Sequence, residues 1–562
     1  EGENIQLVWP ELIYKDFDFE QSQALSGWTA VSGTLENNAR SSNLDISNSP
    51  DNSWFFRLNV RGDIPTGPSD FDADGISTWA EALFGISDIN TQTSWSNTQA
   101  DTDSDGLPDE EISGDRFFTH ALLSNGLDGA PLSDLNASRF LTQATFGPTT
   151  DSINYLKQVG LEAWLEEQIN DLPSTHLKDT FLDFYADYHG PRVRHDYYHF
   201  DNNQPVLPMD NMRTAWGRAV LNGPDQLRQR IAFALSQILV ISGQDANLNR
   251  MPISVASYYD HFIDNAFGNY YDHLEYVTFH ACMGLYLSHV GNQKARPELN
   301  IFPDENYARE LMQLFTIGLW ELNPDGTRTL DEQGEPIPSY GQTEITELAR
   351  VMTGFWFAGE DFGEGGWNDR SGIKPMELHV PQHDFGSKQI VGGHTIPSRE
   401  PLLDNAYQDV KDAVRLIFEH PNTPVFISKQ LIQFLVTDNP TPEYVERVQS
   451  VFVDNGEGER GDLGAVVKAI LLNQEARSPL YFAHSDQTGF LKEPALRLMQ
   501  LGRVFKVAEH PRFQMWQLFS LEEEFSQDPL NAPSVFNFFK PHYEPSGLLG
   551  DEGMVGPVFQ IL

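Results

Sequence analysis

Apolar residues recur with the period of an α-helix through most of the chain. Over residues 226–240 they fall on one helical face, at Leu227, Ile231, Ala234, Leu235 and Ile238. Similar patterns predict further helices over 406–419, 426–436, 443–453, 463–472 and 491–507. Pro, Gly and Asn separate these segments and are typical of helix ends. The pattern therefore predicts a mainly α fold, with a large multi-helix domain over 131–562.

Residues 303–318 combine an apolar and a polar helical face. Pro303 and Asp304 are typical of a helix start, and Gly318 is typical of a helix end. The apolar stripe consists of Tyr307, Leu311, Leu314 and Phe315, and the polar stripe consists of Asn306, Arg309, Glu310 and Gln313. Residues at these spacings share a face. The polar stripe is either a solvated, salt-bridged surface or a buried polar network that lines a cleft.

The beginning of the chain has a different pattern. Aromatic and β-branched runs such as SWFFRLNV, broken by Gly, Asn and Ser, predict strands and turns. We therefore expect a small β-rich module over 1–62. Residues 63–130 are rich in Asp, Gly, Ser and Thr, and they form the predicted junction with the helical domain. The aromatic tail after residue 530 is expected to pack back onto the helical body.

The charge of the chain excludes one class of partner. The 562 residues include 37 Lys and Arg against 81 Asp and Glu, a net charge of −44. Such a chain repels a phosphate backbone, so we expect no nucleic-acid partner. No stretch approaches the roughly 18 apolar residues that cross a bilayer, so no membrane span is expected. The acidity is concentrated at the start, where residues 1–136 carry 24 acidic and 5 basic side chains.

Cys282 is the single cysteine, so stability cannot depend on an intrachain disulfide or a CxxC metal site. The chain begins with Glu1 and shows no signal segment, as a mature or trimmed form would. The acidity and the calcium-type loops described next favour a location where free calcium is abundant. We therefore expect a secreted, periplasmic or cell-surface bacterial protein.

The strongest chemical signal is the run DFDADGISTWAE over residues 70–81. It has acids at loop positions 1, 3 and 5, glycine at position 6 and glutamate at position 12, as in an EF-hand. Alternate side chains then point inward around the cation, and Gly75 permits the sharp turn. The expected ligands, including one backbone carbonyl at Ile76, are Asp70, Asp72, Asp74, Ile76, Thr78 and Glu81.

A second loop, DTDSDGLPD over residues 101–109, repeats this opening. Its expected ligands are Asp101, Asp103, Asp105, the Leu107 carbonyl and Asp109. Position 12 is Ile112, which has no side-chain ligand, so Glu110 or Glu111 would have to substitute or the ion would be shared with the first loop. The pair resembles the calcium repeats of thrombospondin type-3, in which bound calcium makes a spacer between domains rigid. Calcium is therefore the expected cofactor.

The helical region resembles the bacterial domain-of-unknown-function family 1800 over about residues 134–562. The matching segments are SRFLTQATFGP at 138–148, the 226–242 helix, HACMGLYL at 280–287, ENYARE at 305–310, LARVMTG at 348–354, HD at 383–384 with Lys388, and APSVFN at 532–537. The resemblance implies export. It also implies a neighbouring protein that resembles sulfatases and alkaline phosphatases as a candidate partner.

The chain departs from this family at two positions. Many members carry Glu and His where this chain has Gln313 and Phe315, so a metal centre common to the whole family is not expected here. Glu305, Arg309 and Glu310 match the family pattern.

Three other motifs are weak signals for a site. His195 and His199 have helical metal-ligand spacing without a third ligand nearby. His379 and His383 share that spacing, but Pro381 between them predicts a loop. GEGERG over 456–461 follows a helix and carries acids that would repel a pyrophosphate, so it predicts a loop and not a dinucleotide site. Asp384 and Lys388, close to His383, are candidates for a polar cluster with it.

Two functions follow from these patterns. The first is an extracytoplasmic calcium-binding protein whose helical domain docks a partner protein or an extracellular polymer. The alternative is a secreted hydrolase-like enzyme with a Glu/Arg/His cleft. In that enzyme Glu305 or Glu310 is the acid or base, Arg309 holds an anionic group, and His280 or His383 carries the proton.

Overall fold

The chain divides into two compact units, residues 1–122 and 123–562, and each is described by itself. In the first unit the computed structural model describes five strands. In the second it describes residues 132–189, 209, 212–364, 372–477, 492–507 and 527–538. The predicted calcium loops at 70–81 and 101–112, and the pair His195 and His199, lie outside the described residues. The three-part division into 1–62, 63–130 and 131–562 stays a prediction.

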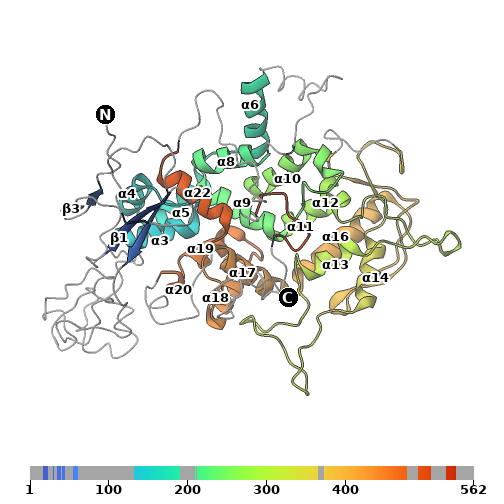
Figure 1. Ribbon diagram of the computed structural model, residues 1–562. Helices are drawn as coiled ribbons and strands as arrows, with labels where there is room; N and C mark the ends of the chain where they lie inside the picture. The colour runs from blue at the N-terminus through green and yellow to red at the C-terminus, as the bar shows by residue number, and fades with distance from the viewer. Residues whose placement is uncertain are drawn as a thin grey trace. The chain divides into compact units, whose positions relative to one another are not determined.

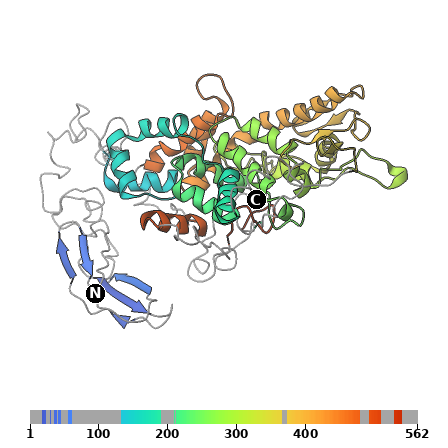
Figure 2. The same ribbon diagram turned by 90° about the horizontal axis from the view of Figure 1, so that it is seen from above.

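The strands of the first unit form two small antiparallel sheets (Figure 2). They are β1 (Phe17–Ser22), β2 (Thr29–Ala30), β3 (Leu35–Asn38), β4 (Ser41–Leu44) and β5 (Phe55–Val60). The larger sheet has the order β2-β1-β5, and Phe17 lies opposite Val60. Strands β3 and β4 pair as a hairpin.

The second unit is mainly α, as the periodicity predicts (Figure 1). Its first half contains α3 (Asp134–Ala144), α4 (Thr150–Val159), α5 (Leu161–Asn170), α6 (Leu177–His189), α8 (Met212–Asn222), α9 (Gln226–Ile238), η5 (Leu248–Arg250), α10 (Pro252–Asp264), α11 (Tyr270–Phe279), α12 (Ala281–Tyr286), η6 (Pro297–Leu299) and α13 (Asn306–Gln313). Its second half contains α14 (Gln342–Val351), α16 (Leu403–Glu419), α17 (Asn422–Leu435), α18 (Pro442–Val453), α19 (Leu463–Leu471), α20 (Gln474–Arg477) and α22 (Pro494–Val504).

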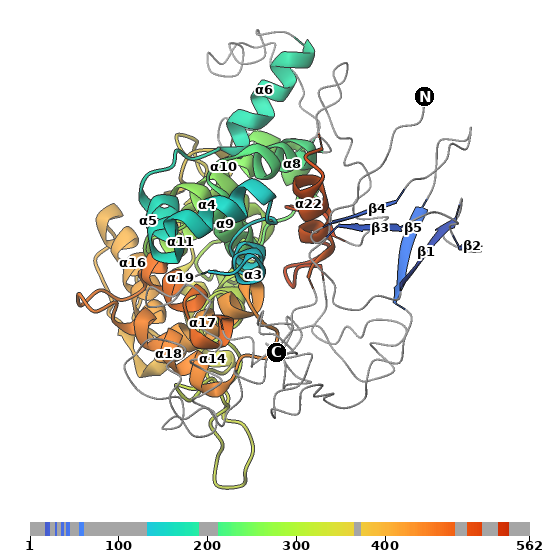
Figure 3. The ribbon, with the colours of Figure 1, turned by 90° about the vertical axis from the view of Figure 1, so that its left-hand side faces the viewer.

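Short strands and turns connect α14 to α16. Strand β6 (Phe355–Trp356) pairs with β7 (Glu377–Leu378), and β8 (Lys388–Gln389) pairs with β9 (Thr395–Ile396) across η7 (Val391–Gly393). A further hairpin over residues 319–339, held by isolated bridges such as Trp320 with Pro338, extends from the helical body (Figure 3). None of the helices described here is long and apolar enough to cross a membrane.

One apolar core runs through the helical unit. Around α8, α9 and α10 it contains Trp216, whose indole nitrogen donates to the Tyr259 hydroxyl over 3.1 Å. Phe146 packs edge-on against Trp216 at 5.4 Å. Pairing the indole and hydroxyl groups with each other removes the cost of burying them.

The tail after residue 530 packs on the helical body within the described part, as expected. Ser242 pairs with Asn531 as an isolated bridge, and Gly243 donates to the Leu530 carbonyl over 2.8 Å. The predicted loop at 456–461 is also confirmed, since no helix or strand covers it and its three glycines have positive φ.

Candidate functional site

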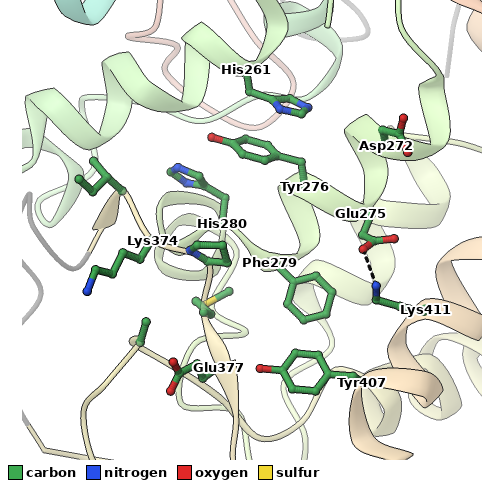
Figure 4. A pocket seen from close by; sticks show the side chains of 14 residues that line it. His261, Asp272, Glu275, Tyr276, Phe279, His280, Lys374, Glu377, Tyr407 and Lys411 are labelled. Atoms are coloured by element: carbon green, nitrogen blue, oxygen red, sulfur yellow. Dashed lines mark ion pairs between the residues drawn. The ribbon is translucent and has the colours of Figure 1, made fainter. Parts of the chain in front are cut away.

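A pocket of about 680 Å³ opens beside α11 and α16 (Figure 4). This volume lies within the range of small-molecule and cofactor sites. Its apolar and aromatic wall consists of His261, Tyr276, Phe279, His280, Ala358, Ile373, Pro375, Met376 and Tyr407. Its charged residues are Asp272, Glu275, Lys374, Glu377 and Lys411.

The chain around Pro375 and Met376 forms one side of the pocket. The Met376 amide donates to the Phe279 carbonyl over 2.7 Å, and His280 pairs with Pro375 as an isolated bridge. Gly284 permits this packing, because a Cβ at that position would lie 2.6 Å from the Met376 sulfur. The segment before β7 is thereby fixed against the junction of α11 and α12.

Aromatic rings stack in two groups along the wall. Tyr276 lies parallel to His261 with ring centroids 3.6 Å apart, and its ring is 5.1 Å from that of His280. Figure 4 shows Tyr276 between these two imidazoles. Phe279 and Tyr407 form the second group at 5.7 Å. Such rings supply large, rigid contact surfaces at little cost in conformational entropy.

The neighbouring residues determine which nitrogen of each imidazole carries the proton. His280 is the N-cap of α12, where its Nδ1 accepts from the Cys282 amide over 3.1 Å. Asn265 donates its side-chain amide to His261 Nδ1 over 3.2 Å. An accepting nitrogen is unprotonated, so in both neutral rings the proton is on Nε2. Both Nε2 atoms are buried and have no hydrogen-bond partner.

Both imidazoles are neutral at physiological pH. Burial lowers the pKa of His280 to about 3. Burial, together with the nearby His273 and His280, lowers the pKa of His261 to about 2. Neither ring can exchange protons efficiently near neutrality, because an efficient acid or base has a pKa close to the working pH. Each ring instead keeps its Nε2–H group buried behind the surface of the pocket.

The charged residues of the pocket are partly neutralised. Lys411 lies 2.9 Å from a Glu275 carboxylate oxygen, and Figure 4 marks this ion pair. Glu377 accepts the Gly359 amide over 3.2 Å. Asp272 and Lys374 are exposed at the rim. The pocket therefore combines apolar rings with both hydrogen-bond donors and acceptors.

The predicted catalytic residues do not all meet here. Of the five, only His280 lines this pocket. Glu305, Arg309 and Glu310 lie at the start of α13 or within it. His383 lies in the loop after β7. A shared Glu/Arg/His cleft is therefore not formed at the pocket, and a catalytic role for these residues stays a prediction.

Glu305 connects α13 to α14. Its carboxylate accepts from Gln342 and from Thr346, each over 2.8 Å, and lies 3.3 Å from an Arg309 nitrogen. These contacts occupy the carboxylate oxygens. The ion pair with Glu305 places Arg309, a member of the polar stripe, in the salt-bridged surface that the sequence allowed for this stripe.

Glu310 lies in the other environment that the sequence allowed for the polar stripe, a buried one. It is 6% exposed, and its Oε2 is buried without a hydrogen-bond partner. Burial raises the pKa of Glu310 to about 7, although the positive charge of Arg309 opposes this shift. The hydroxyl of nearby Tyr340 is also buried and without a partner. Glu310 is therefore titratable near neutrality.

His383 and Lys388 do form a polar cluster, as the sequence suggested, and it is fully buried. Lys388 Nζ donates to Asp409 over 2.7 Å, and His383 Nε2 lies 3.3 Å from the same oxygen. Arg399 also binds Asp409. Asp384 instead pairs with Arg350 at 2.8 Å. The contacts of this cluster are within the protein, so it fixes the loop after β7 to α16.

Sequence reasoning missed most of the pocket. Of the pocket residues it singled out only His280, and it passed over His261, Tyr276, Tyr407 and Lys411. One available signal was the density of aromatic and acidic residues over 270–280. No set of three or more His, Cys, Asp or Glu suited to a metal occurs within the described ranges.

The fold and this site define a mainly helical protein with an aromatic pocket. Most of the chain, residues 139–556, matches the model of the family described as protein of unknown function (DUF1800). The chain belongs to this family, which confirms the resemblance of the helical region. Comparison with curated proteins gives no match, and comparison with solved structures gives none either. The resemblance of the loops to thrombospondin type-3 repeats stays a prediction.

Proposed function

We propose that this is an extracytoplasmic, calcium-binding bacterial protein whose helical domain docks a partner protein or an extracellular polymer. The docking site is the pocket beside α11 and α16. The observation that carries the proposal is the aromatic wall of this pocket, where Tyr276 stacks on His261 and Phe279 stacks on Tyr407. Rings of this kind suit binding, because they supply large, rigid contact surfaces at little cost in conformational entropy.

The calcium part of the proposal rests on the sequence pattern alone. Carboxylates at alternate positions beside Gly75 are suited to a hard cation with oxygen ligands. Binding would neutralise part of the clustered negative charge and make the junction between the units rigid. Abundant external calcium and the high acidity support a secreted, periplasmic or surface location.

Two binding assays test the docking function. One is co-sedimentation with insoluble chitin, cellulose and peptidoglycan, and the other is pull-down of a purified protein that resembles sulfatases or alkaline phosphatases. We expect retention on at least one of these, and about a tenfold loss of binding in the double variant Tyr407→Ala with Lys374→Ala. Tyr155→Ala is the matched control, because Tyr155 is an exposed tyrosine on α4. Binding unchanged by the double variant would contradict docking at this pocket.

A second function, the secreted hydrolase, is favoured by one observation. Glu310 has a pKa near 7 and a free, buried carboxylate oxygen, which suits a general acid or base. A panel of chromogenic esters and glycosides tests this function. Turnover that disappears in a folded Glu310→Gln variant and survives in Glu305→Gln would support the enzyme. No turnover of the panel by the wild-type protein would leave docking as the better proposal.

A further inference from the structure

A small cavity, here called the α17 cavity, lies between α17 and the 319–339 hairpin. It has a volume of about 80 Å³ and shares no residue with the pocket beside α11 and α16. The buried side chain of Asn422, at the start of α17, holds the hairpin in place. Its oxygen accepts from the Leu322 amide over 3.1 Å, and its nitrogen donates to the Trp320 carbonyl over 2.8 Å. The shape of the cavity is therefore fixed by contacts within the protein.

Two cationic side chains line this cavity from different elements. Arg328 lies opposite Leu322 in an isolated bridge of the hairpin, so the two side chains share a face, and both line the cavity. Lys429 comes from α17, on the same helical face as Phe426. The turn at Gly326 packs on the lysine stem, because a Cβ at that position would lie 3.7 Å from the Lys429 Cδ atom. The hairpin thus brings an arginine to a lysine that is fixed on the helix.

The protein does not neutralise the charge of Lys429. Among the residues that the structure describes, Lys429 has no hydrogen-bond or ion-pair partner, and no acidic side chain lines the cavity. Burial and the positive charge of Arg328 both lower the pKa of Lys429. The Arg328 guanidinium also lies 5.4 Å from the centre of the Trp320 ring, beside the cavity. An anion placed between the two cations would replace their repulsion by attraction.

We propose that the α17 cavity binds a small oxyanion, namely sulfate, phosphate or the carboxylate group of a small acid. The ammonium of lysine and the guanidinium of arginine both bind the charged oxygen atoms that these groups share. The volume is far below the roughly 300 Å³ of pockets for drug-sized ligands, so the ligand is a small ion. The net charge of −44 opposes the approach of any anion, so we expect a dissociation constant on the order of 1 mM. This site is independent of the proposed docking function.

Equilibrium dialysis of the full chain against radiolabelled sulfate, phosphate and acetate tests the inference, with sodium chloride keeping the ionic strength constant. We expect at least one of the three ions to bind, and to bind about tenfold more weakly to Lys429→Gln. Lys157→Gln is the matched control, because it removes the same charge from an exposed lysine on α4, outside the cavity. Arg328→Gln carries the test if Lys429→Gln does not fold. Equal binding by the wild type and the cavity variant, or no binding of any of the three ions at millimolar concentration, would overturn the proposal.

The reactivity of Lys429 locates the bound ion without a substitution. An anion beside the ammonium favours its protonated form, so the oxyanion that binds in dialysis should slow the acetylation of Lys429 by trace acetic anhydride. Mass spectrometry of the digested chain measures this rate, and the rate at Lys157 should not change. Equal slowing by chloride at the same ionic strength would assign the effect to screening and overturn the oxyanion site. An unchanged rate at Lys429 in the presence of the bound ion would place the ion elsewhere and overturn it as well.

Discussion

Asp409 is a completely buried carboxylate that binds several cationic or hydrogen-bonding groups. Burial alone would raise the pKa of Asp409, but hydrogen bonds from His383 and Lys388 lower it below the ordinary value. A depressed carboxyl pKa adds stability that is present above the pKa of the unfolded chain and is lost as the pH falls. The cluster is therefore expected to weaken in acid.

Replacing this carboxylate tests how much the cluster stabilises the helical unit. Asp409→Asn leaves the buried Lys388 without a charge partner, so we expect a loss of roughly 3 to 5 kcal/mol in the free energy of unfolding. Asp412→Asn is the control, because Asp412 is part-exposed and binds the other side of Arg399 and the side-chain amide of Gln408. It should cost no more than about 1 kcal/mol. Equal shifts in the urea midpoints would contradict this account.

Glu310 is expected to have the opposite effect on stability. Its folded pKa is raised from 4.5 to about 7, so the folded chain holds a proton that the unfolded chain has released. Stability therefore falls as the pH rises between these two values. Glu310→Gln should be more stable than the wild type by roughly 1 to 3 kcal/mol at about pH 8, and similar to it at about pH 4.

Thermal melts of both proteins across this pH range measure the difference. Glu305→Gln provides the comparison, because Glu305 already accepts hydrogen bonds from Gln342 and Thr346. That variant should gain nothing at the higher pH. A pH-independent difference between Glu310→Gln and the wild type would show that the burial of Glu310 does not control its ionisation.

Helix boundaries were only partly predictable from the capping signals of the chain. The sequence predicts one helix that ends at 419 and a second that begins at 426. Helix α16 does end at Glu419, but α17 already begins at Asn422, within the predicted break. The helix expected over 303–318 is shorter, and α13 ends at Gln313. Its last turn widens, because the Glu310 carbonyl accepts from both Leu314 and Phe315. No local sequence signal distinguishes such a wide turn from a regular one.

The pocket could be predicted only in part because its wall is assembled from distant segments. His280 belongs to a family motif and was a candidate from the sequence, but Tyr407 and Lys411 lie on α16, far along the chain. Their approach depends on how α11 packs on α16, which periodicity does not specify. The tautomers of His261 and His280 depend in turn on contacts with Asn265 and Cys282 that exist only in the folded chain.

Gly318 shows how one position ends the widened turn after α13. Its φ is +78°, and a Cβ there would lie 2.8 Å from the ring of Phe426. Gly318→Ala therefore combines backbone strain with a clash. Gly334 has a φ of +85° but no atom within 4 Å, so Gly334→Ala carries the strain alone. We expect Gly318→Ala to lose about 1 to 3 kcal/mol more in unfolding free energy. Equal losses would contradict the clash.

The distribution of charge differs between the two ends of the molecule. Residues 1–136 hold 24 of the 81 acidic side chains and only 5 of the 37 basic ones. In the helical unit, by contrast, acidic side chains such as Asp409 and Glu305 are paired with cations or hydrogen-bond donors. The two units are thus expected to respond differently to ions. Added cations should stabilise most strongly the part of the chain where acidic residues lack basic neighbours in the sequence.

Calcium should therefore stabilise the part of the chain that carries the loops and leave the melting of the helical unit unchanged. A ligand present at about 100 times its dissociation constant stabilises by about 2.7 kcal/mol, which calorimetry resolves as a shift of one transition. Asp72→Asn with Asp74→Asn should remove the shift, because both positions are expected ligands of the first loop. Asp331→Asn, at an exposed aspartate in the 319–339 hairpin, should retain it. The calcium assignment would be refuted if the calorimetric profiles were identical with millimolar calcium and with chelator and if no calcium were retained after dialysis. The pocket proposal would remain intact in that case.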